Sequence, residues 1–350
     1  MSKQELFFKS NDGKTNIHMV SWLPEGEVLG IVQVNHGVSE HIGRYEEFAQ
    51  FLNSHGILVV GIDLLGHGMS TNNGDKKMYF GPDGSYKVVL ADIDHVVNEV
   101  RANYPNVPYT MLGLSLGSFL TRAYYIDNPN KVDGAILIGT SHLGKISYKL
   151  ARFVVDKEAK KYGDEALTEK IRDLAFGTYN KYFKPNRTAY DWLCKSERAV
   201  DEYIDDPLRG GNLSVGIFRE VLNSMMYCSQ VDNIGKTNKD FPIVLLSGAD
   251  DYVGDKGKGV QKALSVLQKQ GLKKASMKLY PSLRHAILHE DERVVVFEDI
   301  LRWLKENKLI LEKSEPTLVV EEKELEKKSE PSDGLVDYDE YDVVWPKVGV

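Results

Sequence analysis

The sequence predicts an α/β protein with a mostly parallel central sheet, helices on both faces of the sheet and an inserted helical cap. Short apolar runs rich in β-branched residues alternate with helical stretches, which is typical of a parallel sheet covered on both faces. Roughly a hundred residues, from 141 to 240, interrupt this alternation without a convincing buried strand. A chain of 350 residues that is 42% hydrophobic is long enough to bury a core of this size.

The chain is expected to begin with an antiparallel hairpin, because the runs at 5–9 and 16–23 flank the turn signal Asn11-Asp12-Gly13. Six apolar runs predict the parallel strands; they lie at 31–35, 57–63, 109–113, 134–138, 242–247 and 276–280. Helical periodicity between the strands predicts helices at 44–55, 85–103, 116–128, 256–270 and 291–308.

These elements divide the chain into four parts. Residues 1–140 and 241–310 are expected to form the two parts of one core, with residues 141–240 as a helical cap over one end of the sheet. Residues 311–350 are an acidic tail with twelve Asp/Glu and five Lys/Arg, which accounts for the whole net charge of −7. We expect this tail to be disordered or a docked arm that binds an unknown partner, with a short helix over 321–328.

The composition argues against several classes of protein. Outside the tail, 39 acidic residues balance 39 basic ones and no basic run is present, so we expect no nucleic-acid partner. The start of the chain lacks an apolar signal core and no run is long enough for a membrane span, which favours a cytoplasmic protein. Cys194 and Cys228 do not have the spacing of a zinc site, so we expect buried or partly buried thiols.

The stretch Gly113-Leu114-Ser115-Leu116-Gly117 follows a predicted strand and opens a predicted helix. In that context the pattern indicates a nucleophilic serine on a sharp turn, because small residues are needed where the two backbones crowd. We therefore expect Ser115 to be the nucleophile and the N–H of Leu116 to be one donor of an oxyanion hole. An ordinary strand-to-helix turn with an idle serine is the alternative, since the five-residue pattern also arises by chance.

Three histidines follow Ser115, and the order Ser, acid, His that this architecture uses restricts the choice of base. His142 precedes every candidate acid, so the order excludes it. His285 lies in the loop after the last predicted strand, where open α/β sheets place their sites. His289 falls one turn into the following predicted helix and is expected to be a surface or supporting residue. We predict that His285 is the base.

The acid should follow the strand at 242–247, where Asp250 and Asp251 are adjacent. Their spacing alone does not separate them, and a turn or helix-capping role is the alternative for either.

The second oxyanion donor is expected directly after the strand at 31–35, at the N–H of Val38. His36 precedes the serine and is expected to shape this hole rather than to act as the base. His67 is expected to be a structural turn residue, because a buried histidine is usually a hydrogen-bonded structural group.

Three stretches together resemble a known enzyme family: His36-Gly37-x-x-Glu40-His41-x-x-Arg44-Tyr45, then D-x-x-G-H-G-x-S at 63–70, then G-L-S-L-G at 113–117. They are similar to the monoglyceride lipase and lysophospholipase branch of the α/β-hydrolases, which some classifications group with serine aminopeptidases. The resemblance covers about residues 5–308 and does not extend to the tail. It implies that the acid is the Asp of a G-x-x-D loop, which falls on Asp251, with Tyr252 standing where bacterial members have proline.

The residues and the resemblance together predict a serine hydrolase that cleaves a small-molecule carboxylic ester through an acyl-enzyme, without a metal or organic cofactor. The resemblance implies a monoacylglycerol or lysophospholipid. Transient membrane or micelle contact through the cap is a further expectation. A short-chain or aryl esterase fits the same triad. A proline iminopeptidase-like aminopeptidase would need an acidic cap site for the substrate amine. A non-catalytic ligand sensor or scaffold is the remaining alternative.

The predicted cap also contains apolar side chains that could line an acyl channel. They are Phe153, Phe176, Tyr179, Phe183, Trp192, Ile217, Met225 and Met226. Most of them could equally form the cap's own core, because buried apolar residues usually just pack.

Overall fold

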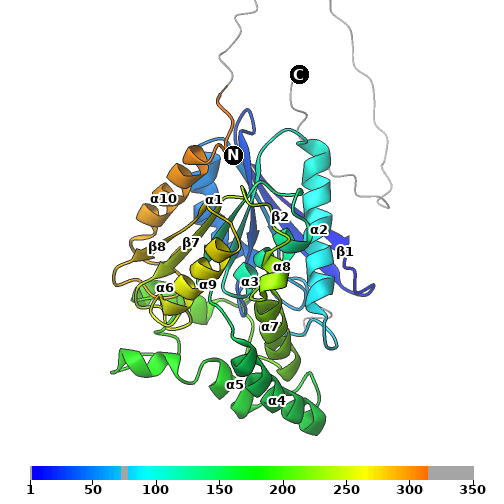
Figure 1. The fold of residues 1–350 in the computed structure, drawn as a ribbon, viewed down its shortest axis with the longest axis vertical. Helices are drawn as coiled ribbons and strands as arrows, with labels where there is room; N and C mark the ends of the chain where they lie inside the picture. Colours follow the sequence, from blue (N-terminus) through cyan, green and yellow to red (C-terminus); the bar gives the residue numbers. More distant parts are fainter. Residues whose placement is uncertain (1, 72–77, 314–350) are drawn as a thin grey trace, which may run out of the picture.

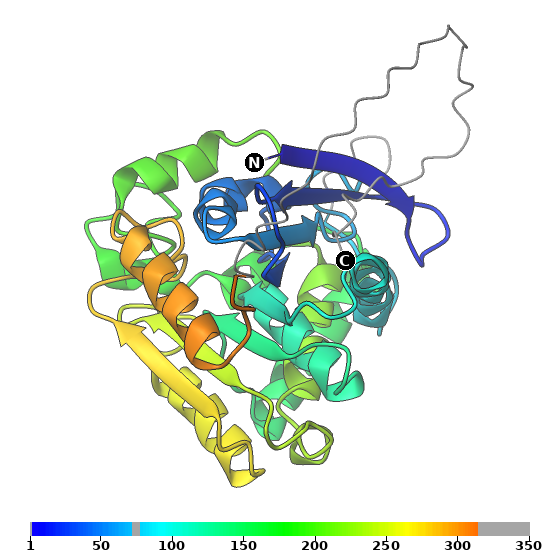
Figure 2. The same ribbon diagram turned by 90° about the horizontal axis from the view of Figure 1, so that it is seen from above.

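The computed structural model describes residues 2–71 and 78–313 of the chain. Its centre is one sheet of eight strands in the order β1-β2-β4-β3-β5-β6-β7-β8, with helices on both faces (Figures 1 and 2). The antiparallel part comprises β1 (Ser2–Lys9), β2 (Asn16–Leu23) and the pairing of β2 with β4. The parallel strands are β3 (Gly30–Asn35), β4 (Ile57–Ile62), β5 (Tyr109–Leu114), β6 (Gly134–Ile138), β7 (Ile243–Gly248) and β8 (Ala275–Tyr280). The predicted fold class is confirmed.

The inner strands are mostly apolar because helices cover both faces of the sheet. Every residue of β3, β4, β5, β6 and β7 is buried, whereas the edge strands β1 and β8 are partly exposed. All eight predicted strands are present. β1 begins three residues earlier than predicted, since its pairing with β2 extends to Ser2 opposite Leu23.

Two hydrophobic clusters, one on each face of the sheet, hold the helices in place. One packs α2 (Tyr86–Asn103), α3 (Leu116–Asp127) and α9 (Lys258–Lys269) against the sheet. The other packs α1 (Glu46–Asn53) and α10 (Arg293–Glu306). Within β3, Ile31 belongs to the first cluster and Val32 to the second, as expected when successive side chains of a strand point to opposite faces.

Three predicted helix boundaries are corrected by the structure. The helix predicted at 44–55 is a 3₁₀ turn, η1 (Ile42–Tyr45), followed by α1. α9 begins at Lys258 rather than at 256, because Asp255, Lys256 and Gly257 all have positive φ angles that a right-handed helix does not allow.

α10 begins at Arg293 rather than at 291, so His289 lies in a turn before the helix and not one turn into it. Its ring packs edge-on against Tyr45, with the ring centroids 5.7 Å apart.

Between β6 and β7 the chain leaves the sheet, and residues 141–240, here called the inserted segment, contribute no strand to the sheet. Its helices are α4 (Lys145–Tyr162), α5 (Glu169–Ala175), η2 (Tyr179–Phe183), α6 (Glu197–Asp205), α7 (Val215–Tyr227) and α8 (Val231–Ile234). Figure 1 shows α4 and α5 beyond one end of the sheet. Within 2–71 and 78–313, no helix is both long and apolar enough to cross a bilayer.

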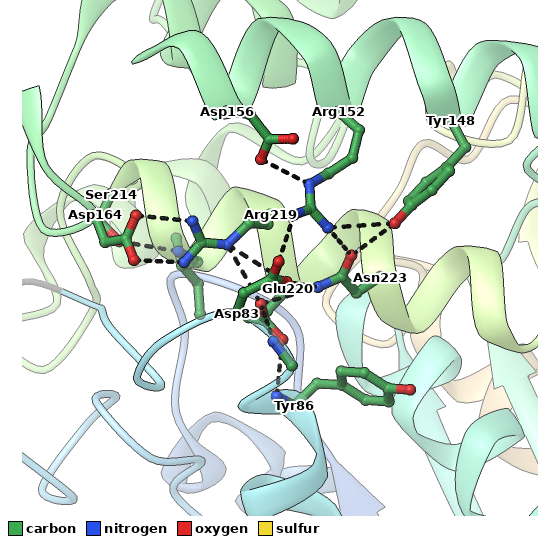
Figure 3. Close-up of polar contacts among 12 residues, drawn as sticks. Asp83, Tyr86, Tyr148, Arg152, Asp156, Asp164, Ser214, Arg219, Glu220 and Asn223 are labelled. Carbon is green, nitrogen blue, oxygen red and sulfur yellow. Dashed lines mark hydrogen bonds and ion pairs between the residues drawn. The ribbon is translucent and has the colours of Figure 1, made fainter. Parts of the chain in front are cut away.

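A polar junction attaches the inserted segment to the stretch of chain that precedes α2 (Figure 3). We use this name for the cluster Asp83, Arg152, Asp164, Arg219, Glu220 and Asn223. Arg219 donates to both oxygens of Asp164, at 2.8 and 2.6 Å. Glu220 is fully buried and accepts the backbone N–H groups of Gly84 at 3.0 Å and Tyr86 at 2.9 Å, while burial raises its pKa.

Two further predictions concern the cysteines and the tail. Cys194 and Cys228 are buried free thiols, as predicted, and burial raises the pKa of both. Of the tail at 311–350, only residues 311–313 are described, so the predictions of disorder, of a helix at 321–328 and of a tail partner lie outside the described residues.

Candidate active site

β5 ends in a strained turn that carries Ser115. Its φ of 53° and ψ of −116° lie outside the regions that non-glycine residues usually adopt, so the surrounding contacts must hold it there. The Ser115 N–H donates to Ile138 O at 2.9 Å. A Cβ at Gly117 would lie 1.8 Å from Asn35 O, so only glycine lets α3 approach β3 this closely. The predicted strand, sharp turn and helix are all present around Ser115.

The loops after β7 and β8 bring Asp251 and His285 together. His285 Nδ1 lies 3.0 Å from Asp251 Oδ2, and the two side chains are 3% and 0% exposed. Asp251 also accepts the N–H of Val253 at 2.8 Å and the hydroxyl of Ser247 at 3.3 Å. Because an ionised carboxylate only accepts hydrogen bonds, the proton of a neutral His285 ring sits on Nδ1 and Nε2 remains an acceptor.

Asp250 points away from this pair. Its side chain is 40% exposed and lies 3.1 Å from Lys256 Nζ. Of the two adjacent carboxylates, the fold brings Asp251 to His285.

The ring of His285 lies against the backbone at the end of β6. A Cβ at Gly139 would lie only 2.7 Å from His285 Cε1, and Gly139 has a φ of 59°. His285 and Ser115 line one cavity, and in the part of the chain that is described no hydrogen bond joins the two side chains. Such bonds are often long before substrate binds, so the arrangement remains compatible with a serine–histidine pair.

The loop after β3 lies beside Ser115. Val38 and Leu116, the predicted oxyanion donors, both line the cavity next to the serine. The Gly37 N–H donates to the carboxylate of Glu40, so Val38 is the next backbone N–H along this loop. Glu40 also accepts the hydroxyl of Tyr45 at 2.9 Å.

His36 is a structural group in this loop, as expected. Its Nε2 accepts the N–H of Leu64 at 2.9 Å, and its Nδ1 lies 2.7 Å from Gly37 O. Both contacts are satisfied when a neutral ring carries its proton on Nδ1. Burial lowers the pKa of His36 to about 3, which keeps it neutral.

The remaining histidines lie outside the cavity wall. His67 is buried in the turn after β4, with Nδ1 3.1 Å from Leu65 O, and burial lowers its pKa to about 4. Neither His142 nor His289 is among the described residues that line the cavity.

The cavity measures about 560 Å³ and lies between the loops that carry Ser115 and His285 and the inserted segment. This size is within the range usual for small-molecule sites. The inserted segment supplies most of the apolar wall; these side chains include Leu143, Leu174, Phe176, Tyr179, Trp192, Phe218, Leu222 and Met225.

Four of the eight apolar side chains considered for a channel therefore line it. They are Phe176, Tyr179, Trp192 and Met225. The other four do not line it. Phe153 is 71% exposed on α4, whereas Ile217 and Met226 are buried in the packing around α7. Phe183 packs against Tyr252, with ring centroids 5.4 Å apart.

Tyr252 links the acid loop to the inserted segment. Its ring stacks on Tyr182 of η2 at 3.8 Å between centroids and 7° between planes. The residue that departs from the bacterial proline thus forms an aromatic contact across the two parts of the molecule.

Glu40 and Arg44 are among the polar residues that line the cavity and that the sequence alone did not place there. They lie 3.4 Å apart, from Arg44 Nε to Glu40 Oε2. The shared motif His36 to Tyr45 contained both, but nothing in it showed that they face the cavity. Among the described side chains, no group of three or more His, Cys, Asp or Glu residues is arranged to hold a metal ion.

Comparison with known proteins shows the family to which the chain belongs. Residues 26–292 match the model of a protein family described as serine aminopeptidase, S33. The chain belongs to this family. Its eight-stranded sheet and its structural neighbours show the α/β-hydrolase fold.

Curated relatives carry the predicted family name. The chain is 27% identical to a monoglyceride lipase of Rattus norvegicus over 297 residues, covering 81% of this chain and 84% of the relative. It is 25% identical to a monoacylglycerol lipase of Mycolicibacterium smegmatis over 296 residues, covering 81% and 90%. A crystal structure of a thermostable carboxyl esterase from Bacillus coagulans, in complex with glycerol, superposes with a TM-score of 0.80 at 26% identity, covering 87% of this chain and 99% of the esterase. These likenesses confirm the predicted resemblance and support a carboxylic ester hydrolase.

Proposed function

We propose that the protein hydrolyses monoacylglycerols or lysophospholipids through an acyl-enzyme formed on Ser115. The observation that carries this proposal is the shared cavity. Ser115 on its strained turn and His285, which is paired with the buried Asp251, line one space, and the inserted segment lines that space with apolar side chains. In this proposal residues 141–240 act as a cap on a core made of residues 1–140 and 241–310.

The proposed reaction uses the groups of the site in order. His285 Nε2 takes the proton from the Ser115 hydroxyl as its oxygen attacks the ester carbonyl. The N–H groups of Val38 and Leu116 stabilise the negative oxygen of the tetrahedral intermediate. His285 then gives the proton to the departing alcohol. Water, deprotonated by His285, releases the fatty acid and restores the serine.

Asp251 has two roles in this scheme. Its bond to Nδ1 keeps the His285 proton on the side away from the serine, and its charge stabilises the ring when it becomes cationic. The 0% exposure of Asp251 strengthens both effects, because water does not screen the interaction.

The apolar cavity wall favours an acyl chain over a short acid. Burial of each methylene contributes about 0.8 kcal/mol, so each pair of carbons raises kcat/KM by roughly tenfold until the cavity is full. A short-chain or aryl esterase would lack this dependence.

The alternative of an aminopeptidase needs an unpaired carboxylate for the substrate amine. Among the described residues that line the cavity, Glu40 is the one acidic side chain. It already accepts hydrogen bonds from Gly37 and Tyr45 and lies beside Arg44. Because its charge is already compensated, the cavity favours an ester without a free amine.

We further propose that α4 contacts the lipid aggregate that holds the substrate. Ile146, Leu150 and Phe153 are 77%, 66% and 71% exposed and lie at helical spacing along one face of α4. The same helix carries lysines that anionic lipid head groups attract: Lys145, Lys149, Lys157, Lys160 and Lys161. Exposed apolar side chains that gather on one face indicate an interaction site.

The proposed function is tested with p-nitrophenyl esters and 1-monoacylglycerols of graded chain length, offered to the wild type, Ser115→Ala and His285→Ala. We expect hydrolysis that rises with chain length in the wild type and is lost in both variants. A folded wild type that hydrolyses none of these esters contradicts the proposal. Equal rates for short and long chains would instead favour the short-chain esterase.

A further inference from the structure

The backbone on both sides of His285 donates hydrogen bonds, one to a side chain further along the same loop and one to the inserted segment. The N–H of Arg284 donates to Glu290 Oε1 at 3.0 Å. The N–H of Ala286 donates to Leu193 O, in the inserted segment, at 2.8 Å. Two separate acceptors thus hold the backbone on the N-terminal and the C-terminal side of His285.

Glu290 connects the first of these contacts to the inserted segment as well. It is 0% exposed and accepts the N–H of Lys195 at 3.0 Å to each oxygen and the N–H of Ser196 at 3.1 Å. A carboxylate that accepts several backbone N–H groups makes strong charge-assisted hydrogen bonds. One buried side chain therefore joins two stretches of chain that lie roughly 90 residues apart in the sequence.

Residues 191–196 of the inserted segment, here called the strap, run along the His285 loop. The guanidinium of Arg284 donates to Cys194 O at 3.0 Å and to Asp191 O, and it lies 3.9 Å above the ring of Phe183. Cys194 and Ala286 also share a small apolar cluster that is separate from the two clusters of the sheet. The strap and the loop form one packed unit.

This unit includes a buried charge that the proposed reaction does not use. A buried carboxylate is costly unless its hydrogen bonds are fully made, and the Glu290 carboxylate accepts them from backbone N–H groups of the strap and of the His285 loop. Displacement of a catalytic group by about 1 Å can lower a rate by roughly 10²-fold, so the anchoring of this backbone matters for the reaction.

We infer that Glu290 is a positioning residue for His285, which ties the backbone before the histidine to the strap so that the inserted segment helps to set the catalytic geometry. The inference rests on the proposed role of His285 as the base. It assigns to the inserted segment a part in the reaction itself, in addition to its apolar cavity wall.

The variants Glu290→Gln and Glu290→Ala test this inference, with Glu292→Gln as the matched control. Glu292 pairs with the ammonium group of Lys195 at the surface and is 46% exposed. We expect kcat on a soluble short-chain ester to fall about tenfold in Glu290→Gln, which keeps one acceptor oxygen, and about 100-fold in Glu290→Ala. We expect KM to change less than twofold and the control to match the wild type.

The pH profile separates positioning from a general loss of folded protein. The hydrogen bond between His285 and Asp251 favours the protonated form of the His285 ring. A loosened loop weakens this bond, so the acid limb of kcat/KM should move to lower pH. Loss of folded protein lowers kcat/KM equally at every pH. An unchanged kcat/KM in Glu290→Gln, or a loss with an unmoved acid limb, overturns the inference.

A second readout does not depend on turnover. The low-field proton resonance of the His285 Nδ1–H facing Asp251, identified by its loss in Asp251→Ala, can be recorded in each variant by NMR. We expect it to shift or broaden in Glu290→Gln and to stay in place in Glu292→Gln. If the wild type hydrolyses no ester, the proposed function fails, but an altered resonance still supports the positioning role. An unaltered resonance overturns that role.

Discussion

The loops that carry the proposed triad and the inserted segment that covers them are built in opposite ways. The loops are buried and closely packed: the His285 ring lies against Gly139, and Asp251 is 0% exposed. The inserted segment presents apolar side chains in two directions, with Trp192 facing the cavity and Phe153 facing solvent. On the proposed function, the buried loops would fix one geometry for bond cleavage and the inserted segment would select the substrate.

The inserted segment is attached to the rest of the chain by the polar junction and by the strap, and these two attachments differ in what they contact. The polar junction joins side chains of α4 and α7 to the segment before α2 and includes no residue that lines the cavity. The strap bonds to the backbone beside His285. We therefore expect changes in the polar junction to act on stability and changes in the strap to act on turnover.

The largest effect is expected from the acid. Asp251→Asn should lower kcat by about 10³- to 10⁴-fold for every chain length, because an amide no longer stabilises the cationic ring or fixes its tautomer. The adjacent Asp250→Asn removes a carboxylate from the same loop, but one that pairs with Lys256 at the surface, and should change kcat less than twofold. Steady-state rates on short and long p-nitrophenyl esters measure both. Similar losses in the two variants would remove the distinction between these carboxylates.

A smaller and selective effect is expected in the cavity wall. Met225→Trp fills part of the space beside α7 and should lower kcat/KM for a dodecanoate ester about 30-fold, while the butyrate ester is affected less than threefold. Val231→Trp, on an exposed position of α8, is the control. A loss that is equal for both esters would mean that this wall does not select chain length, and the contrast between core and inserted segment would weaken.

How far the sequence predicts this fold depends on the part of the chain. Strands β3 to β7 are predicted because buried parallel strands are mostly apolar along their length. The hairpin of β1 and β2 is predicted from the turn signal Asn11-Asp12-Gly13 between two short runs. The start of α9 is not, since a left-handed backbone at Lys256 has no signal in the sequence and aspartate, as at Asp255, adopts it only occasionally. The sequence leaves open whether Phe153 lines a channel, because helical spacing alone does not tell which apolar face of a helix in the inserted segment meets the cavity.

In the candidate site, too, the sequence predicts the residues that belong to local patterns and misses a residue whose contacts form only on folding. Ser115 and His285 are predicted from local patterns, a glycine-flanked turn and a loop after the last strand. Glu290 is missed because its role depends on the N–H groups of Lys195 and Ser196, which only folding brings near. No spacing or residue type in the sequence marks such an acceptor.

The smallest effect is expected on the outer face of α4. Leu150→Ser combined with Phe153→Ser should weaken binding to vesicles of phosphatidylcholine and phosphatidylglycerol about fivefold, because two exposed apolar side chains no longer enter the bilayer surface. Hydrolysis of a soluble butyrate ester should stay within twofold of the wild type. Leu208→Ser with Val231→Ser, also exposed but outside α4, serves as the control in a vesicle sedimentation assay. Equal binding by both double variants would remove α4 as the contact.

The most direct test of the account is to trap the acyl-enzyme. The wild type is mixed with p-nitrophenyl dodecanoate, quenched in acid within milliseconds and digested, and the peptide that contains Ser115 is examined by mass spectrometry. We predict that this peptide carries the dodecanoyl group, with one p-nitrophenol released per acyl group formed, and that His285→Ala shows no acylation on the same timescale. Turnover of the ester with the acyl group on another residue, or with none on Ser115 at any time, would contradict the account.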